Sequence, residues 1–380
     1  MKEQLLPIGK EIKSHLCEIS DFIYANPELG NQEYKAVEKL TTFLSKNGFD
    51  ITSPVAGINT AFSAVYDSGK PGLSVAFLCE YDALPEIGHG CGHNMIGAIS
   101  VGAGVILSKV FELLSTLGGK VYVFGTPAEE TNGAKVAMTD QGLFNNMDAV
   151  MMVHPTDETR ESGASLAIEA LQFVYKGKTS HASGCPEDGI NALNSVIHLF
   201  TGIDSLRQHV TPDVRMHGII TKGGVAANIV PDEAIAQFYL RAATKEYLAV
   251  VKEKVLNIAN AAALITGATL TVSNYELSND DLKTNANLSE AFSENLRLLG
   301  IDDIKPPTEP KGSSDIGNVS NVAPTIHPYI GIVPTGTELI GHSVEMANAT
   351  TTEFAHERLL IAALALAYTG VDVLTKNVDL

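Results

Sequence analysis

Residue types that bind metal ions recur directly after three apolar runs of the chain, at residues 73–79, 121–125 and 149–153. The side chains of these types that follow the runs are Asp82, Cys91, His93, Glu129, Glu130 and His154. Imidazole, thiolate and carboxylate groups are the protein ligands of Zn²⁺ and related divalent ions. If the three runs end at the same place in the fold, these residues can form a metal site.

Short, apolar, β-rich runs of this kind are typical of strands that are buried on both faces of a parallel sheet. In such sheets, ligands bind beyond the carboxyl ends of the strands. Each residue alone also has a common structural role, because a lone Cys packs as a small hydrophobe and a lone His is often a core or surface residue. The prediction of a metal site therefore depends on the recurrence of these types at strand ends.

A turn at Cys91-Gly92-His93 can bring a thiolate and an imidazole to one half of a metal cluster. Glu130 and His154 supply another half, which leaves Glu129 as a general base for a water molecule activated by the metal. Two other hypotheses are open. Cys91 could be a nucleophile with His93 or His154 as its base, or the chain could be a ligand-binding or assembly subunit without activity.

The elements that must position these residues alternate between strand and helix. Helices are expected at residues 8–24, 33–47, 96–113 and 135–141, so the fold class is α/β, with a mostly parallel sheet covered by helices. Residues 166–280 follow the order β-α-β-β-α-β and predict an inserted ferredoxin-like domain. We therefore expect a discontinuous catalytic domain, residues 1–165 and 281–380, and an inserted lid or dimerisation domain, residues 166–280.

Composition excludes several classes of partner. The chain has 380 residues, with 26 Lys and Arg against 44 Asp and Glu and a net charge of −18. This charge disfavours nucleic acid and anionic membranes. Residues 1–12 do not resemble a secretory signal, and the apolar stretches at 96–107 and 359–374 are short for a membrane span. Four scattered cysteines without a CxxC pair favour a reducing cytoplasm.

The remaining histidines lack neighbours of this chemistry in the sequence. We expect His89 to be a loop residue, because it lies further from the turn. The others are expected to be structural or surface residues, namely His15, His198, His209, His217, His327 and His356.

The motifs around these residues resemble the M20 metallopeptidase family, and within it the amidohydrolase-like branch, subfamily D. The resemblance covers nearly the whole chain. It rests on the segments 26–30, 80–85, 89–94, 125–130, 178–182, 223–232, 312–320 and 341–343. Two departures are Asn94, where many members have Asp, and the segment 130–135, which has fewer glycines than in many relatives.

The resemblance implies a role for each matching residue. The implied metal ligands, for one or two Zn²⁺ or Mn²⁺ ions, are Cys91, His93, Glu130, His154 and His342. Glu129 would be the general base and acid, and Asp82 would orient His93. His181 would reach the active site of a partner subunit in a homodimer and stabilise the oxyanion. Asn228 and Arg241 would hold the carboxylate of a small N-acyl amino acid or dipeptide.

Overall fold

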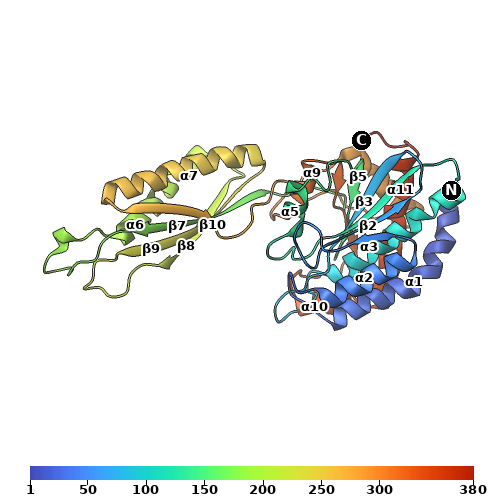
Figure 1. Cartoon of the computed structure of the whole chain (residues 1–380), viewed down its shortest axis with the longest axis horizontal. Helices are drawn as coiled ribbons and strands as arrows, with labels where there is room; N and C mark the ends of the chain where they lie inside the picture. The colour runs from blue at the N-terminus through green and yellow to red at the C-terminus, as the bar shows by residue number, and fades with distance from the viewer. The chain divides into compact units, whose positions relative to one another are not determined.

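The computed structural model describes residues 1–380, and the chain divides into two compact units (Figure 1). Unit 1 comprises residues 1–164, 282–310 and 314–380. Unit 2 comprises residues 165–281 and 311–313.

Unit 1 is built on a six-stranded sheet with the strand order β1-β2-β4-β3-β5-β11. The strands are β1 (Asp50–Thr52), β2 (Phe62–Asp67), β3 (Leu73–Cys79), β4 (Gly119–Gly125), β5 (Ala149–Met151) and β11 (Thr325–Ile326). From β4 to β11 the neighbours run parallel, whereas β1 and β2 form an antiparallel edge. The prediction of a mostly parallel sheet is confirmed. A separate parallel pair joins β6 (His154–Thr156) to β12 (Tyr329–Gly331).

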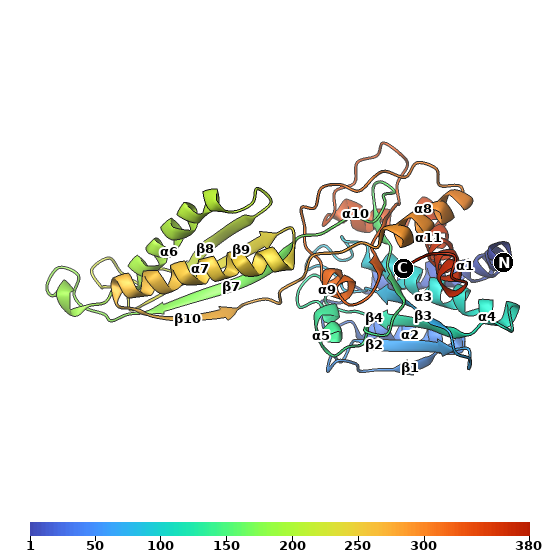
Figure 2. The same ribbon diagram turned by 90° about the horizontal axis from the view of Figure 1, so that it is seen from above.

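Helices cover both faces of this sheet, as Figure 2 shows from above. They are α1 (Lys2–Ala25), α2 (Tyr34–Lys46), α3 (His93–Ser108), α4 (Val110–Leu113), α5 (Ala134–Asp140), α8 (Ala286–Leu298), α9 (Ile316–Ser320), α10 (Val344–Ala349) and α11 (Glu353–Leu374). Alternate residues of β3 belong to different cores. Val75 and Phe77 pack in the core that includes α1, α3 and α11, and Ala76 and Leu78 pack in the core that includes α5 and α9. This two-sided burial explains the continuous apolar run.

Helix α3 is buried along its whole length. Glycine allows its neighbours to approach closely, because a Cβ at Gly102 would lie 2.6 Å from Leu16 Cδ1 and one at Gly104 would lie 2.6 Å from Val123 Cγ2. Residues 93–113 are long and apolar enough to cross a membrane, but 83% of the apolar window is buried inside the protein. A buried core helix of a globular protein has the same properties.

Unit 2 has a four-stranded antiparallel sheet with the order β10-β7-β9-β8. Its elements are β7 (Ala167–Lys176), η1 (Pro186–Asp188), α6 (Ala192–Leu206), η2 (Arg207–His209), β8 (Arg215–Lys222), β9 (Glu233–Ala242), α7 (Lys245–Thr266) and β10 (Thr269–Asn274). The side chain of Asn191 caps α6 by accepting from two backbone N–H groups, and Thr244 caps α7. The predicted ferredoxin-like β-α-β-β-α-β order is confirmed.

Candidate metal centre

The carboxyl ends of β3, β4 and β5 meet at one edge of the unit 1 sheet, because these strands are parallel neighbours. Cys79 and Gly125, the last residues of β3 and β4, are directly paired. The segments that follow these strands therefore start side by side. They place Asp82, Glu129, Glu130 and His154 within one neighbourhood, and the turn before α3 adds Cys91 and His93.

The structure brings the five sequence-predicted ligands together in two overlapping sets. The ligand atoms of Cys91, His93 and His154 lie within 4.8 Å of one another, and so do those of Cys91, Glu130 and His342. Cys91 belongs to both sets. A thiolate in this position can bridge two cations and offset their mutual repulsion.

His342 comes from a segment far along the chain, and the backbone fixes it. Its N–H donates to the carbonyl of Gly90 over 2.8 Å, which holds residue 342 against the turn that carries Cys91. Its Nε2 lies 3.3 Å from Glu130 Oε1. The side chain is 57% exposed, so this member of the second set faces solvent.

Hydrogen bonds orient the two inner imidazoles. His93 Nδ1 donates to Asp82 Oδ1 over 2.9 Å, and His154 Nδ1 donates to the carbonyl of Pro155 over 2.8 Å. In both rings this leaves Nε2 as the nitrogen that can bind a metal. This atom lies 3.4 Å from Cys91 Sγ in His154 and 3.3 Å from Glu80 Oε2 in His93. His93 Nε2 and Glu130 Oε1 are buried without a hydrogen-bond partner. These two atoms belong to a set of nitrogen, sulfur and oxygen donors. Because buried polar atoms usually have a partner, their lack of one is consistent with a site for a divalent ion.

The pKa of Cys91 disfavours a cysteine nucleophile, and the pKa of His154 fits a neutral imidazole ligand. Burial raises the pKa of Cys91 to about 12, whereas a nucleophilic thiol needs a lowered pKa. Burial and neighbouring His93 lower the pKa of His154 to about 4, which keeps its ring neutral. Burial also lowers the pKa of His93, but Cys91, Asp82 and Glu80 raise it well above its ordinary value. Metal binding would displace protons from Cys91 and His93.

Glu129 lies beside the ligands. Its carboxylate, that of Glu130 and the ring of His93 have atoms within 4.8 Å of one another. Burial raises the pKa of Glu129 to about 8, with further contributions from Glu80 and Asp315. A carboxyl group with a pKa near neutrality can both take and return a proton, as a general base and acid must.

Several buried groups near the centre were not predicted. His327, expected to be structural or surface, is 7% exposed, and its ring centroid lies 5.7 Å from that of His154. It directly follows β11, the fourth parallel strand of the same edge, and this strand-end position is the signal that could have identified it. Glu33 is buried and accepts from the N–H of Ala128 over 2.9 Å. His89 is a loop residue, as predicted, but it is buried with both ring nitrogens unpartnered.

Unit 2 carries the three remaining candidates, and it does not bring all of them together. His181 pairs with Ile229 in an isolated bridge, and Ala182 N donates to Asn228 O over 3.0 Å, so these two candidate segments are adjacent. Arg241 lies at the other end of β9, where its Nη1 donates to Ser313 Oγ over 3.2 Å. At ~3.3 Å per residue, roughly 26 Å of β9 separates Glu233 from Arg241.

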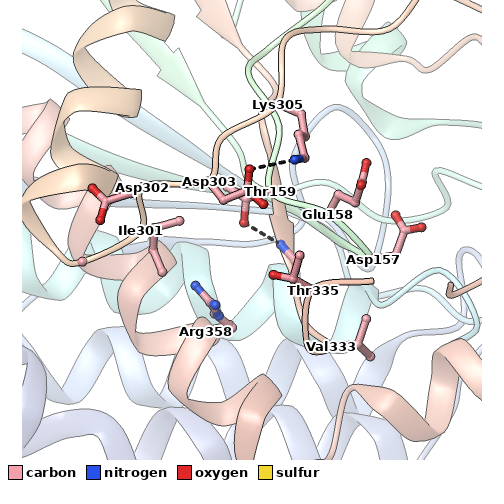
Figure 3. Close-up of a pocket in the computed structure, with 12 residues that line it drawn as sticks. Asp157, Glu158, Thr159, Ile301, Asp302, Asp303, Lys305, Val333, Thr335 and Arg358 are labelled. Carbon is pink, nitrogen blue, oxygen red and sulfur yellow. Dashed lines mark hydrogen bonds and ion pairs between the residues drawn. The ribbon is translucent and has the colours of Figure 1, made fainter. Parts of the chain in front are cut away.

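A cavity of about 160 Å³ in unit 1 shares no residue with the two ligand sets (Figure 3). Asp157, Glu158, Asp302 and Asp303 line it together with Lys305 and Arg358. The Lys305 ammonium pairs with Asp303 over 2.7 Å. The cavity contains charges of both signs and no thiol or imidazole, so it does not resemble the metal centre.

Comparisons with known proteins agree with this fold. Residues 168–266 match the model of the peptidase dimerisation domain of M20 proteins. Xaa-Arg dipeptidase from Mus musculus is 37% identical and covers 96% of this chain and 87% of its own length. A p-aminobenzoyl-glutamate hydrolase component from Escherichia coli is 28% identical and covers 95% of this chain and 89% of its own length.

A solved structure shares the fold. A dinuclear metal-binding peptidase of the M20 family from Bacillus subtilis superposes with a TM-score of 0.70 at 20% identity, and covers 96% of this chain and 99% of its own. The fold and these relatives thus define a metallohydrolase with an inserted α+β domain. The chain belongs to the M20 family of peptidases and amidohydrolases.

Proposed function

We propose that this protein hydrolyses the amide bond of dipeptides or small N-acyl amino acids with a free carboxylate. The observation that supports this best is the pair of ligand sets that share Cys91, with Glu129 beside them. The Xaa-Arg dipeptidase at 37% identity makes dipeptides with a C-terminal Arg the first substrates to test. N-aroyl-glutamates follow, from the name of the E. coli relative.

The proposed ligands are Cys91, His93, Glu130, His154 and His342, which would hold one or two Zn²⁺ or Mn²⁺ ions. Such ions supply Lewis-acid chemistry, since they polarise a carbonyl and lower the pKa of water. Glu129 takes a proton from the attacking water and passes it to the leaving amine. Asp82 keeps the Nδ1–H form of His93 and so directs Nε2 to the ion. His181 donates to the developing oxyanion.

The position of Arg241 supports a site completed by a second copy of the chain. In one chain Asn228 lies in the loop before the first residue of β9, and Arg241 lies at the other end of this strand, so they cannot hold the same small carboxylate. Two copies related by a two-fold axis can each supply one of the two groups. We therefore assign residues 166–280 as a lid and dimerisation domain, and residues 1–165 and 281–380 as the catalytic domain.

Four unpaired cysteines support a cytoplasmic location. The experiment that tests the function is amine release, followed by mass spectrometry, from dipeptides with and without C-terminal Arg, N-acetyl amino acids and N-aroyl-glutamates. The protein is stripped with a chelator and reloaded with Zn²⁺ or Mn²⁺. We expect cleavage only after reloading, and a loss of several orders of magnitude in kcat for Glu129→Gln with the metals still bound. The exposed Glu112→Gln is the matched control.

Activity of the stripped enzyme, or full activity of Glu129→Gln, would overturn the mechanism. The shared site has its own test, in which two inactive variants, Glu129→Gln and His181→Ala, are mixed and allowed to exchange subunits. If His181 serves the partner's site, one of the two sites in each mixed dimer is intact, and about a quarter of the wild-type activity returns. No recovery after proven exchange would place His181 in its own subunit's site.

A further inference from the structure

A buried ion cluster adjoins Glu129 and has no part in the mechanism above. The Lys135 ammonium donates to Glu80 Oε1 and to Asp315 Oδ1, each over 2.6 Å. The three side chains are 0%, 2% and 1% exposed, respectively. Lys135 is the one Lys or Arg among the buried residues of the chain. A buried ammonium requires a specific partner or role, because its transfer from water is unfavourable by several kcal/mol.

The cluster has the composition of a cation site. The carboxylates of Glu80, Glu129 and Asp315 have oxygens within 4.8 Å of one another. Three carboxylates at this separation repel one another strongly in a buried environment. The Lys135 ammonium contacts two of them, so it offsets this repulsion beside the proposed general base.

Contacts within the same cluster also hold the segment that carries Glu129 in place. Asp315 Oδ2 accepts from the N–H of Lys135 over 3.1 Å. The segment also passes so close to Asp315 that a Cβ at Gly133 would lie 2.3 Å from Oδ2. Helices α5 and α9, which start beside Lys135 and Asp315, lie next to each other in Figures 1 and 2 and share one apolar core.

The cluster also reaches the metal centre. Glu80 Oε2 lies 3.3 Å from His93 Nε2, the ring nitrogen that is proposed to bind the ion. Glu80 follows β3, Lys135 lies in α5 and Asp315 precedes α9. The ammonium therefore links three segments, and these segments set the distance between Glu129 and the proposed metal ligands.

We propose that Lys135 is a positioning residue for Glu129: its ammonium, held by Glu80 and Asp315, fixes the segment 129–135 in the geometry for proton transfer. This inference rests on the proposed role of Glu129 as the general base. Lys135 itself does not touch the substrate. A displacement of about 1 Å at a reacting group can reduce turnover ~100-fold, while ground-state binding changes little.

The test compares Lys135→Met with wild type, and with Lys109→Met as the control, a lysine outside the site whose side chain is 28% exposed. We measure kcat and KM on a substrate that wild type cleaves, metal ions per chain, and the thermal unfolding midpoint. Lys135→Met should retain its metal ions, keep KM within about threefold and lose kcat ~100-fold. Lys109→Met should match wild type in all four quantities.

Lys135→Met leaves two buried carboxylates without a cation and can unfold the protein, so a second variant is required. Lys135→Met/Asp315→Asn removes one of these charges, and such neutral replacements of buried ion pairs are often well tolerated. The positioning role predicts that this double variant folds and binds metal but keeps the low kcat. A purely structural role predicts that kcat returns together with stability.

The inference fails if kcat of either folded variant lies within about threefold of wild type, or if neither variant folds, which would make the cluster a structural element only. These outcomes differ from failure of the proposed function. In that case wild type itself would cleave no amide substrate after metal reloading.

Discussion

His327 provides a pH test of the buried histidine cluster. Burial and neighbouring His154 lower the pKa of His327 to about 3, whereas an unfolded chain has a His pKa of about 6.5. The folded state therefore binds fewer protons than the unfolded state below about pH 6.5. Stability from this residue is present above that pH and is lost as the pH falls toward 3.

The magnitude follows from the two pKa values. Between pH 7 and pH 5, His327 gains a proton in the unfolded chain but stays neutral in the folded chain. The free energy of unfolding therefore falls by about 2 kcal/mol. His327→Gln does not titrate at this position. Its loss of stability between pH 7 and pH 5 should be smaller than that of wild type by the same amount.

The assay is urea unfolding of chelator-stripped protein at both pH values. Tyrosine fluorescence or circular dichroism reports it, because the chain has 11 Tyr and no Trp. The exposed His198→Gln is the control and should follow wild type. If wild type and His327→Gln lose equal stability, His327 is not held neutral beside His154, and the description of the buried cluster is wrong.

Three further changes test the site. Gly133→Ala places a carbon 2.3 Å from Asp315 Oδ2, so the unfolding free energy in urea should fall by ~1–3 kcal/mol through overpacking. Cys91→Ser removes the ligand shared by both sets; metal ions per chain should fall, and proton release on metal binding, measured by calorimetry in two buffers, should drop by about one. Asp82→Asn weakens the hold on His93 Nδ1, and competition with a coloured chelator should show a ~10–100-fold loss of metal affinity. The three arguments would be contradicted, respectively, by an unchanged unfolding free energy, by unchanged metal content and proton release, and by an unchanged metal affinity.

The sequence predicted the sheet because buried parallel strands appear as continuous apolar runs, and it predicted the clustered residue types because they follow those runs. It did not predict β1 and β2, which form an antiparallel edge. β1 has only three residues, and neither strand has a continuous buried run. Short edge strands carry little periodicity.

The ion cluster was missed for a different reason. Lys135 and Asp315 are 180 residues apart, and no local pattern marks either of them as buried. A lysine in an amphipathic helix is expected to be solvated. Only the three-dimensional path of the chain reveals that α5 and α9 meet and that the charges of these two residues pair there.

The segment around Glu129 shows how a loop can position the proposed general base. Ala128 has a φ of 61°, a left-handed conformation that is unfavourable for a residue with a Cβ. Three buried carboxylates from separate elements accept hydrogen bonds from backbone N–H groups of this segment. Glu33 accepts from Ala128 over 2.9 Å, and Asp82 accepts from Glu130 over 3.1 Å. Asp315 accepts from Lys135 over 3.1 Å.

Each of these anchors links Glu129 to another part of unit 1. Asp82 also accepts from His93 Nδ1, so one carboxylate sets both the direction of a proposed metal ligand and the position of the residue next to the proposed general base. Asp315 likewise makes two contacts, because it accepts from both the backbone N–H and the ammonium group of Lys135. Because the anchors come from the start of α2, the end of β3 and the start of α9, the distance from Glu129 to the ligands is fixed by the packed core and not by the loop itself.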